Sequence, residues 1–252
     1  MPRRIPLSAV VPCYNEAPNI PPLRQTLTEL PLFSGGQLEI VLVDDGSRDD
    51  TWKLLSEWAR STPRVKAVRL FENCGNQHAI LAGIHQSSGE AVAVLDADLQ
   101  DPPEHLVKML DKLEKSSVSA VIGIQKGQNE RGKAPAWLKA AAVLVHPLRP
   151  GEVDFCVMKR PVARDLLALG DAETPFCVRR YRALRNHKKA YFSYERRPRR
   201  SGQTKFPTAK RAALGWRIFR SMRLQRSDRT DVFIPRMQTL VESKASGVNF
   251  VN

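Results

Sequence analysis

Three carboxylates and a glutamine follow a short apolar run in the first half of the chain. Asp96, Asp98 and Asp101, with Gln100 between them, come directly after the apolar residues 91–95, and two prolines follow. This pattern is typical of a buried parallel strand. Ligands bind at the carboxyl ends of such strands, and hard divalent cations prefer oxygen ligands. The residues predict a site for a metal ion and a diphosphate, but aspartates in this short pattern also cap helices and turns.

Polar loops follow two earlier apolar runs as well. The loop 12–16 follows residues 7–11, and the loop 44–47 follows residues 38–43. Carboxylates at three successive strand ends predict hydrogen bonds to a base and a ribose, together with a metal ion on the diphosphate. Neither a Gly-x-Gly-x-x-Gly turn nor a Gly-Lys-Ser/Thr phosphate loop occurs, so a dinucleotide enzyme and a P-loop NTPase are not supported.

Strands and helices are expected to alternate from the start of the chain. This alternation implies right-handed crossovers, and hence an α/β fold with a mostly parallel sheet and helices on both faces. The predicted strands are 7–11, 38–43, 65–71, 91–95 and 118–124, and the predicted helices are about 19–29, 51–60, 78–86 and 106–113.

The net charge of +14 is concentrated in the second half of the chain. Residues 1–125 have a net charge of −4, and residues 126–252 have a net charge of +18. The second half should therefore bind anionic surfaces. It lacks the motifs of nucleic-acid binding, so a membrane surface or a phosphorylated substrate is favoured over nucleic acid. The cluster Arg179, Arg180, Arg182, Arg185, Lys188 and Lys189 is expected to form a solvated helical face, with a lipid headgroup surface as the alternative.

Cysteine usage and hydropathy indicate where the protein acts. The four cysteines are scattered without a Cys-x-x-Cys pair, which predicts a reducing compartment and no structural zinc. No apolar run approaches the roughly 18 residues that a spanning helix needs. We expect a cytoplasmic protein that lies at the cytoplasmic face of a membrane, bound to anionic lipid or to a membrane-anchored partner protein.

Three motifs in this order resemble the family 2 glycosyltransferases of the GT-A fold. They are VPCYNE at 11–16, VDDGS at 43–47 and LDADLQDPPE at 95–104. Within that family the likeness is greatest to the polyprenyl-phosphate glycosyltransferases, which include dolichol-phosphate mannose synthases and undecaprenyl-phosphate sugar transferases. The segment GNQHAILAG at 75–83 is similar to the bacterial enzymes. The resemblance implies a GT-A domain over 1–206, with a nucleotide-binding half at 1–125 and an acceptor half at 126–206, followed by a basic arm at 207–252.

The resemblance also implies roles for individual residues. Asp98 and Gln100 would hold Mg²⁺ or Mn²⁺, and Arg199 and Lys205, in the later segment RRSGQTK, would meet the donor diphosphate or the acceptor phosphate. An arginine is expected after the fifth strand, where this chain has Gln125. The nucleoside would lie against Pro12, Tyr14, Glu16, Val43 and Asp45, and the diphosphate against Asp96, Ala97 and Asp98.

The acceptor is inferred from what the motifs lack. A hydroxyl acceptor needs a positioned general base, and the Glu-Asp dipeptide that carries it in processive family members is absent. A phosphate monoester is already anionic at neutral pH. We expect inverting transfer of a sugar from a nucleoside-diphosphate donor to a polyprenyl phosphate. A saccharide or protein hydroxyl acceptor remains an alternative, and so does a catalytically inactive binding module, which the glutamine at position 125 would favour.

Overall fold

The fold of the chain is described by a computed structural model, over residues 5–126, 151–169, 176–198, 237–241 and 249–251. The strands are β1 Leu7–Cys13, β2 Leu38–Asp44, β3 Val65–Leu70, β4 Ala91–Val94, β5 Ala120–Gln125, β6 Glu152–Lys159, β7 Lys189–Tyr194, β8 Met237–Val241 and β9 Asn249–Val251. The helices are α1 Ile20–Thr28, α2 Pro31–Ser34, α3 Thr51–Ser61, α4 Asn76–Gln86, α5 His105–Lys115, α7 Arg160–Ala168 and α8 Phe176–Ala183. Short 3₁₀ turns cover 17–19 and 184–186.

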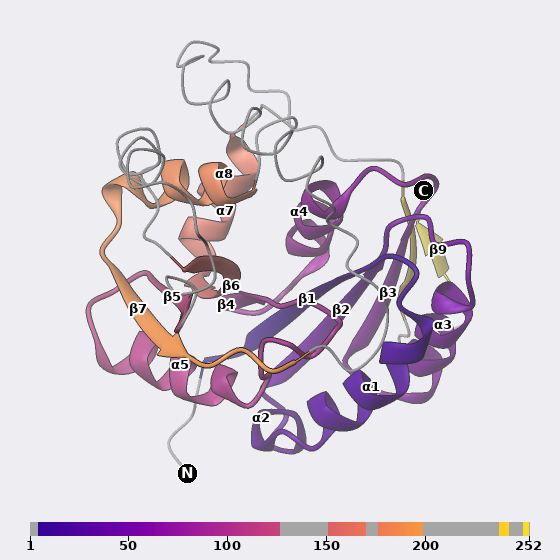
Figure 1. The fold of residues 1–252 in the computed structure, drawn as a ribbon. Coiled ribbons are helices and arrows are strands. Elements are labelled where there is room, and N and C mark those ends of the chain that lie inside the picture. The colour runs from indigo at the N-terminus through magenta and orange to yellow at the C-terminus, as the bar shows by residue number, and fades with distance from the viewer. Residues whose placement is uncertain (1–4, 127–150, 170–175, 199–236, 242–248, 252) are drawn as a thin grey trace, which may run out of the picture.

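The nine strands form one sheet in the order β7-β5-β6-β4-β1-β2-β3-β8-β9 (Figure 1). β1 pairs in parallel with β2 and β4, β2 with β3, and β5 with β7. β6 runs antiparallel between β4 and β5. The carboxyl ends of β1, β2, β4, β5 and β7 and the start of β6 therefore lie at one edge of the sheet.

Helices cover both faces of the sheet, as the α/β prediction requires. Figure 1 shows α4, α7 and α8 on one face, and α1, α3 and α5 on the other. Side chains of a strand alternate between the faces. In β1, Leu7, Ala9 and Val11 pack into the core beneath α1, α3 and α5, whereas Val10 packs into the core beneath α4 and α7. The two apolar cores fix the strand ends in space, and these ends carry the polar loops.

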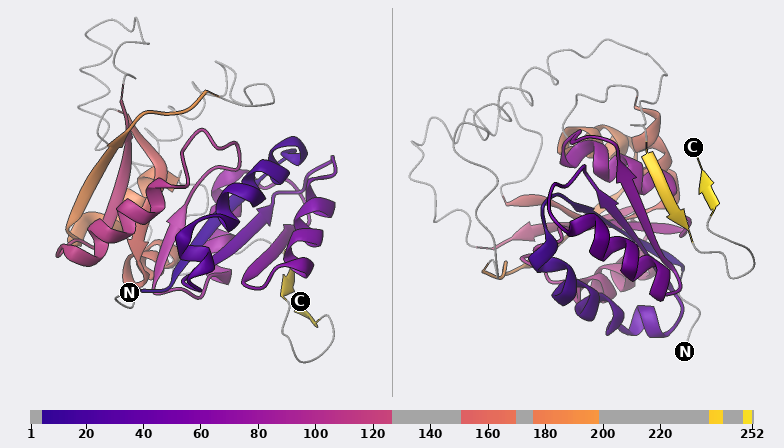
Figure 2. Two further views of the ribbon diagram at one scale, coloured as in Figure 1. Left: turned by 90° about the horizontal axis from the view of Figure 1, so that it is seen from below. Right: turned by 90° about the vertical axis from the view of Figure 1, so that its right-hand side faces the viewer.

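Most predicted elements occur within a few residues of their expected bounds. The predicted helix 51–60 is α3, and the predicted strand 118–124 begins two residues later, at Ala120. From the region predicted as a basic arm, β8 pairs antiparallel with β3, and β9 pairs with β8. Figure 2 shows these two short strands at the opposite side of the sheet from β7. No helix of the described residues is long and apolar enough to cross a membrane.

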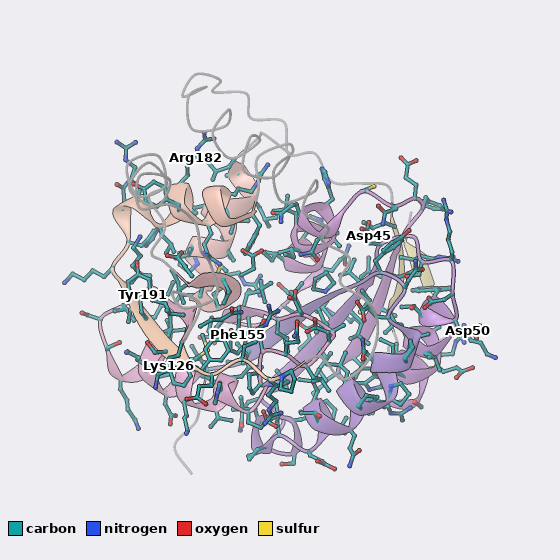
Figure 3. The ribbon with its side chains drawn as sticks, viewed as in Figure 1. Asp45, Asp50, Lys126, Phe155, Arg182 and Tyr191 are labelled. Atoms are coloured by element: carbon teal, nitrogen blue, oxygen red, sulfur yellow. The ribbon has the colours of Figure 1, made fainter. Side chains whose placement is uncertain are left out.

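The expectation of a solvated basic face is wrong for two of its residues. Arg179 and Arg180 on α8 are 3% and 1% exposed. Their guanidinium groups pair with carbonyls and carboxylates inside the domain, because a buried charge needs partners. Arg185 is exposed, and Arg182 points away from the sheet (Figure 3). The spacing of the basic residues in the sequence did not separate the buried pair from the exposed ones.

Candidate active site

The metal-site prediction centres on the loop that leaves β4. Leu99 has a φ of +57°, the left-handed conformation that bulky residues rarely adopt. Its side chain is nevertheless buried. This turn brings the main-chain N–H of Gln100 to 3.1 Å from Oδ1 of Asp98. Strained backbone of this kind is often found at functional sites, so the conformation is consistent with a loop shaped for binding.

Asp101 ties the β4 loop to the end of β7. Its carboxylate is 3% exposed, and it accepts a hydrogen bond from the hydroxyl of Tyr194. Nε of Arg196 lies 3.3 Å from the same oxygen. The buried side chain of Gln125 lies beside the same two residues. Since Gln125 is directly opposite Tyr194 in the β5–β7 pairing, two strand ends and the loop after β4 converge on one buried carboxylate.

The main chain beyond β7 is fixed to the same loop. The N–H of Arg197 donates to the carbonyl oxygen of Gln100 at 2.9 Å, and Nε2 of Gln100 lies 3.4 Å from the carbonyl oxygen of Arg197. The side chain of Arg197 is 3.4 Å from Glu104, whereas Nη2 of Arg196 reaches to 3.6 Å from Asp96. The two adjacent arginines thus contact different carboxylates.

Crowded carboxylates raise the proton affinity of this region. Partial burial, and then the charges of Asp101 and Asp98, raise the pKa of Asp96, while Arg196 opposes that rise. Burial raises the pKa of Asp101, and Arg196 and the Tyr194 hydroxyl oppose it. Burial and the adjacent Asp101 raise the pKa of Tyr194, which keeps the phenol protonated as a donor. A bound cation would relieve the repulsion among these carboxylates.

The oxygen groups of this loop fit a hard divalent cation. Asp96, Asp98 and the side-chain carbonyl of Gln100 are all oxygen donors, the kind that Mg²⁺ and Mn²⁺ prefer. Among the described residues no group of three or more His, Cys, Asp or Glu side chains is placed to hold a metal ion. Mg²⁺ is commonly bound by one or two carboxylates together with substrate phosphates and water, so this donor set suits a site that the substrate completes.

The loops after β1 and β2 form a second polar region. Asp45 is buried, and its carboxylate accepts hydrogen bonds from the N–H groups of Cys74 and Gly75, at 2.8 and 2.9 Å, and from the Asn73 side chain at 3.1 Å. Burial raises the pKa of Asp45 to about 6, although these donors favour the ionised form. Asp45 therefore positions the loop before α4, near which it lies in Figure 3.

Other residues predicted to contact the nucleoside differ in exposure. Tyr14 and Glu16 are half-buried in the loop after β1, where the N–H of Glu16 donates to Oγ1 of Thr51 at 2.8 Å. Pro12 and Val43 are buried. The side chain of Val43 packs in the core beneath α4, so a nucleoside would meet only its main chain.

An ion-pair network around the buried Arg180 joins α8 to the start of β6. Arg180 lies 2.9 Å from Glu152 and 3.5 Å from Asp154, and it donates to the carbonyl oxygen of Val153 at 2.7 Å. Asp154 precedes by two residues the Cys156 that pairs with Val94 of β4. Burial raises the pKa of Asp154, and Arg180 opposes that rise. The charge of Asp154 also raises the pKa of Asp96, so the two carboxylates face one region.

The structure brings together part of the predicted site. Asp96, Asp98, Gln100 and Gln125 meet at one edge of the sheet, and Asp45 lies on the other side of the β1 loop, with Asn73–Gly75. Arg199 and Lys205 lie outside the described residues. Sequence reasoning missed three residues that meet the cluster: Tyr194, Arg196 and Asp154. No strand was predicted at residues 189–194, so the Tyr-x-Arg sequence at 194–196 gains meaning only from the pairing of β5 with β7.

The sequence was compared with known families and curated proteins. It matches the family described as "Glycosyl transferase family 2" over residues 8–188, which is more than half of the chain. The chain belongs to this family. A relative described as an uncharacterized glycosyltransferase, YkcC of Bacillus subtilis, is 35% identical over 217 residues, 83% of this chain and 66% of that protein. The undecaprenyl-phosphate 4-deoxy-4-formamido-L-arabinose transferase of Pseudomonas aeruginosa is 46% identical over 107 residues, 42% of this chain and 32% of that protein. The chain thus spans less than two thirds of either relative.

Solved structures confirm the GT-A type of fold. A mannosyltransferase from Pyrobaculum calidifontis, solved with GDP-Man and Mn²⁺, has a TM-score of 0.62 and 21% identity, covering 90% of this chain and 66% of that one. Glucosyl-3-phosphoglycerate synthase from Mycobacterium tuberculosis, solved with Mn²⁺, UDP and glucosyl-3-phosphoglycerate, has a TM-score of 0.60 and 18% identity, covering 86% and 78%. At these identities the likeness establishes the fold of this family 2 chain.

Proposed function

We propose that this chain transfers a sugar, with inversion, from a nucleoside-diphosphate sugar to a polyprenyl phosphate such as dolichyl or undecaprenyl phosphate. The observation that carries the proposal is the convergence of Asp96, Asp98 and Gln100 with the end of β7 at the carboxyl edge of the sheet. Ligands of open α/β sheets bind at this edge. The name of the undecaprenyl-phosphate transferase relative supports the choice of acceptor.

Two regions of the chain would bind different parts of the donor. The loops after β1 and β2, with Tyr14, Glu16 and Asp45, would hold the nucleoside. Asp96, Ala97 and Asp98 would line the diphosphate, and Asp98 and Gln100 would hold Mg²⁺ or Mn²⁺. Such an ion supplies positive charge to the departing diphosphate. Arg199 and Lys205 would meet the phosphates of the donor or the acceptor.

The transfer step needs no general base when the acceptor is a phosphate. An oxygen of the polyprenyl phosphate forms the new bond to the anomeric carbon. The bond from that carbon to the donor diphosphate breaks, and its electron pair leaves with the nucleoside diphosphate. Positive groups at the site would stabilise the charge that grows on this leaving group.

A hydroxyl acceptor is the second candidate, and Asp154 is the reason to keep it. Its carboxylate lies at the start of β6, beside β4, and burial raises its pKa. A carboxylate with a raised pKa can take a proton from a hydroxyl during attack. In that reaction a saccharide or protein hydroxyl would replace the lipid phosphate, and Asp154 would be the general base.

The basic second half would hold the protein at the cytoplasmic face of a membrane, through anionic lipid or a membrane-anchored partner protein. Residues 126–252 carry a net charge of +18. Each Lys or Arg near an anionic surface contributes about 1 kcal/mol, and salt screens the attraction. Arg179 and Arg180 do not take part, since both are buried.

The test uses the full chain with radiolabelled nucleotide sugars, Mn²⁺ and vesicles that contain undecaprenyl phosphate. Label that enters the organic phase only with the lipid phosphate, and not with a chelator present, supports the proposal. Label that passes instead to a soluble saccharide favours the hydroxyl acceptor. Nucleotide binding without cleavage of any donor would indicate a binding module, and the absence of nucleotide binding would overturn the proposal.

A further inference from the structure

Arg196 is a partly exposed cation at the centre of the carboxylate cluster. Its side chain is 32% exposed, with Nε 3.3 Å from the buried Asp101 and Nη2 3.6 Å from Asp96, which is 43% exposed. The guanidinium therefore bridges the interior of the protein and the open side of the β4 loop. A planar guanidinium has five N–H donors, and these contacts involve two of its nitrogens.

No arginine occupies the end of β5, where the family resemblance predicts one. Gln125 holds that position, and its side chain is buried against Asp101 and Tyr194. β7 lies beside β5 in parallel, with Tyr194 opposite Gln125, so Arg196 lies two residues beyond the same point of the sheet. A positive charge is thus present near this edge, on the neighbouring strand.

The backbone around Arg196 is held in place on the β4 loop. Hydrogen bonds between the main chain of Arg197 and Gln100, together with the Tyr194–Asp101 contact, join residues 194–197 to residues 98–101. A guanidinium on such a support is well placed for bidentate contacts with phosphate oxygens, which its fork matches better than an ammonium group does. Its distance to Asp96 exceeds ordinary hydrogen-bond lengths, so a phosphate would compete with a weak contact.

We propose that Arg196 binds the diphosphate of the donor and supplies the positive charge that Gln125 lacks. The inference rests on the proposed function, because it assumes that a nucleoside diphosphate occupies the strand-end site. In the substrate-free state Arg196 would rest on Asp96 and Asp101. With donor bound, Nε of Arg196 would stay in contact with Asp101, and its other N–H groups would bind the phosphates. Arg196 would thereby stabilise the departing nucleoside diphosphate.

The alternative is that Arg196 only neutralises the buried Asp101. In that case its loss lowers stability, and it weakens every ligand of the site to the same degree. A role in phosphate binding predicts a selective effect of removing Arg196, because only nucleoside diphosphates carry the second phosphate and lose a binding partner. The ratio of diphosphate to monophosphate affinity therefore separates the two roles.

Arg197 provides the matched control. It is the adjacent arginine, it carries the same charge, and its side chain contacts Glu104 rather than the cluster. Arg196→Gln and Arg197→Gln remove the same charge from neighbouring positions. Arg196→Lys keeps the charge and removes the fork. The thermal midpoint of each variant, measured without ligand, reports any loss of folding.

The experiment is calorimetric titration of the full chain with UDP, GDP and CDP, and with the matching monophosphates, in the presence of Mn²⁺. For the base that binds the wild type, Arg196→Gln should lower diphosphate affinity by about 10- to 100-fold and change monophosphate affinity by less than about threefold. Arg197→Gln should leave both affinities unchanged, and Arg196→Lys should fall between the wild type and Arg196→Gln.

A separate titration with Mn²⁺ alone should show no loss of affinity in Arg196→Gln, in contrast to the titration with nucleoside diphosphates. Removing Arg196 takes a competing cation away from Asp96 and Asp101, so Arg196→Gln should bind Mn²⁺ as tightly as the wild type or more tightly. Equal losses of diphosphate and monophosphate affinity, or weaker Mn²⁺ binding, would overturn the role of Arg196 while leaving the proposed function intact. A wild-type protein that binds none of the nucleotides would overturn both.

Discussion

Tyr194 donates its hydroxyl hydrogen bond to a carboxylate oxygen of Asp101, a residue 93 positions earlier in the chain. This contact joins the last residue of β7 to the loop that carries Asp96 and Asp98. Because Asp101 is buried and Tyr194 is held as a neutral donor, the bond fixes the end of β7 against the proposed metal loop. A shift of β7 would also move Arg196.

Tyr194→Phe should therefore destabilise the protein and loosen the loop. Loss of a hydrogen bond to a buried charged group costs about 1.5 to 3 kcal/mol of unfolding free energy. Urea denaturation measures the change. Tyr181→Phe is the control, since the contact of Tyr181 with Lys189 is made through its ring. A Tyr194→Phe protein as stable as the Tyr181→Phe protein would show that the bond contributes nothing to the fold.

Arg180→Met should be much more damaging than Arg182→Met. It removes the guanidinium that lies 2.9 Å from Glu152, a side chain that is 4% exposed, and breaking such a buried pair costs about 3 to 5 kcal/mol. Arg182 on the same helix is only half-buried and points away from the sheet, so its loss should cost less than about 1 kcal/mol. Thermal unfolding of the two variants checks the difference. Similar midpoints would mean that the Arg180 network is not needed for stability.

Asp45 should make the protein less stable as the pH rises. Its pKa in the folded state is about 6, above the ordinary value of 3.8, so between these values the folded protein binds more protons than the unfolded chain. Unfolding free energy attributable to Asp45 should fall by about 1 to 3 kcal/mol between pH 4 and pH 7. The comparison is chemical denaturation of wild type and Asp45→Asn across this range, in which the variant should lack this decrease.

Asp49 provides a control of opposite sign. Although burial opposes it, hydrogen bonds from Thr51 and the N–H of Ala17 lower the pKa of Asp49. Its contribution to stability is present at neutral pH and is lost as the pH falls. The unfolding free energy of the wild type, relative to that of Asp49→Asn, should therefore increase as the pH rises. Identical pH profiles for the Asp45 and Asp49 variants would contradict both assignments.

Local patterns predicted the first half of the fold well. Apolar runs such as 38–43 and 91–95 are buried on both faces, so their sequences alone identify strands, and the polar residues after them mark the carboxyl edge. The antiparallel course of β6 and the pairing of β8 with β3 depend on contacts between distant segments. No local pattern specifies such pairings.

The candidate site also contains residues that a local motif predicts and residues that only long-range contacts bring to it. Asp96, Asp98 and Gln100 lie in one short motif, and the sequence places them together. Arg196 joins them only because β7 pairs with β5, and Arg180 is buried only because α8 packs against β6. A basic helix looks the same in the sequence whether its arginines face solvent or a buried carboxylate. Pairing across the sheet therefore decides which charges belong to the site.

The most direct test of glycosyl transfer at this edge is donor turnover by Asp98→Asn beside Asp50→Asn. Both changes remove one carboxylate charge, but Asp98 is a proposed metal ligand, whereas Asp50 is exposed at the start of α3 on the rim of the molecule (Figure 3). Release of nucleoside diphosphate from the matching donor is measured with saturating Mn²⁺ and undecaprenyl phosphate. The rate of Asp98→Asn should be at least about 100-fold below that of the wild type, as expected when several kcal/mol of transition-state stabilisation are removed. Asp50→Asn should keep the wild-type rate. Equal turnover by Asp98→Asn and wild type would contradict the account.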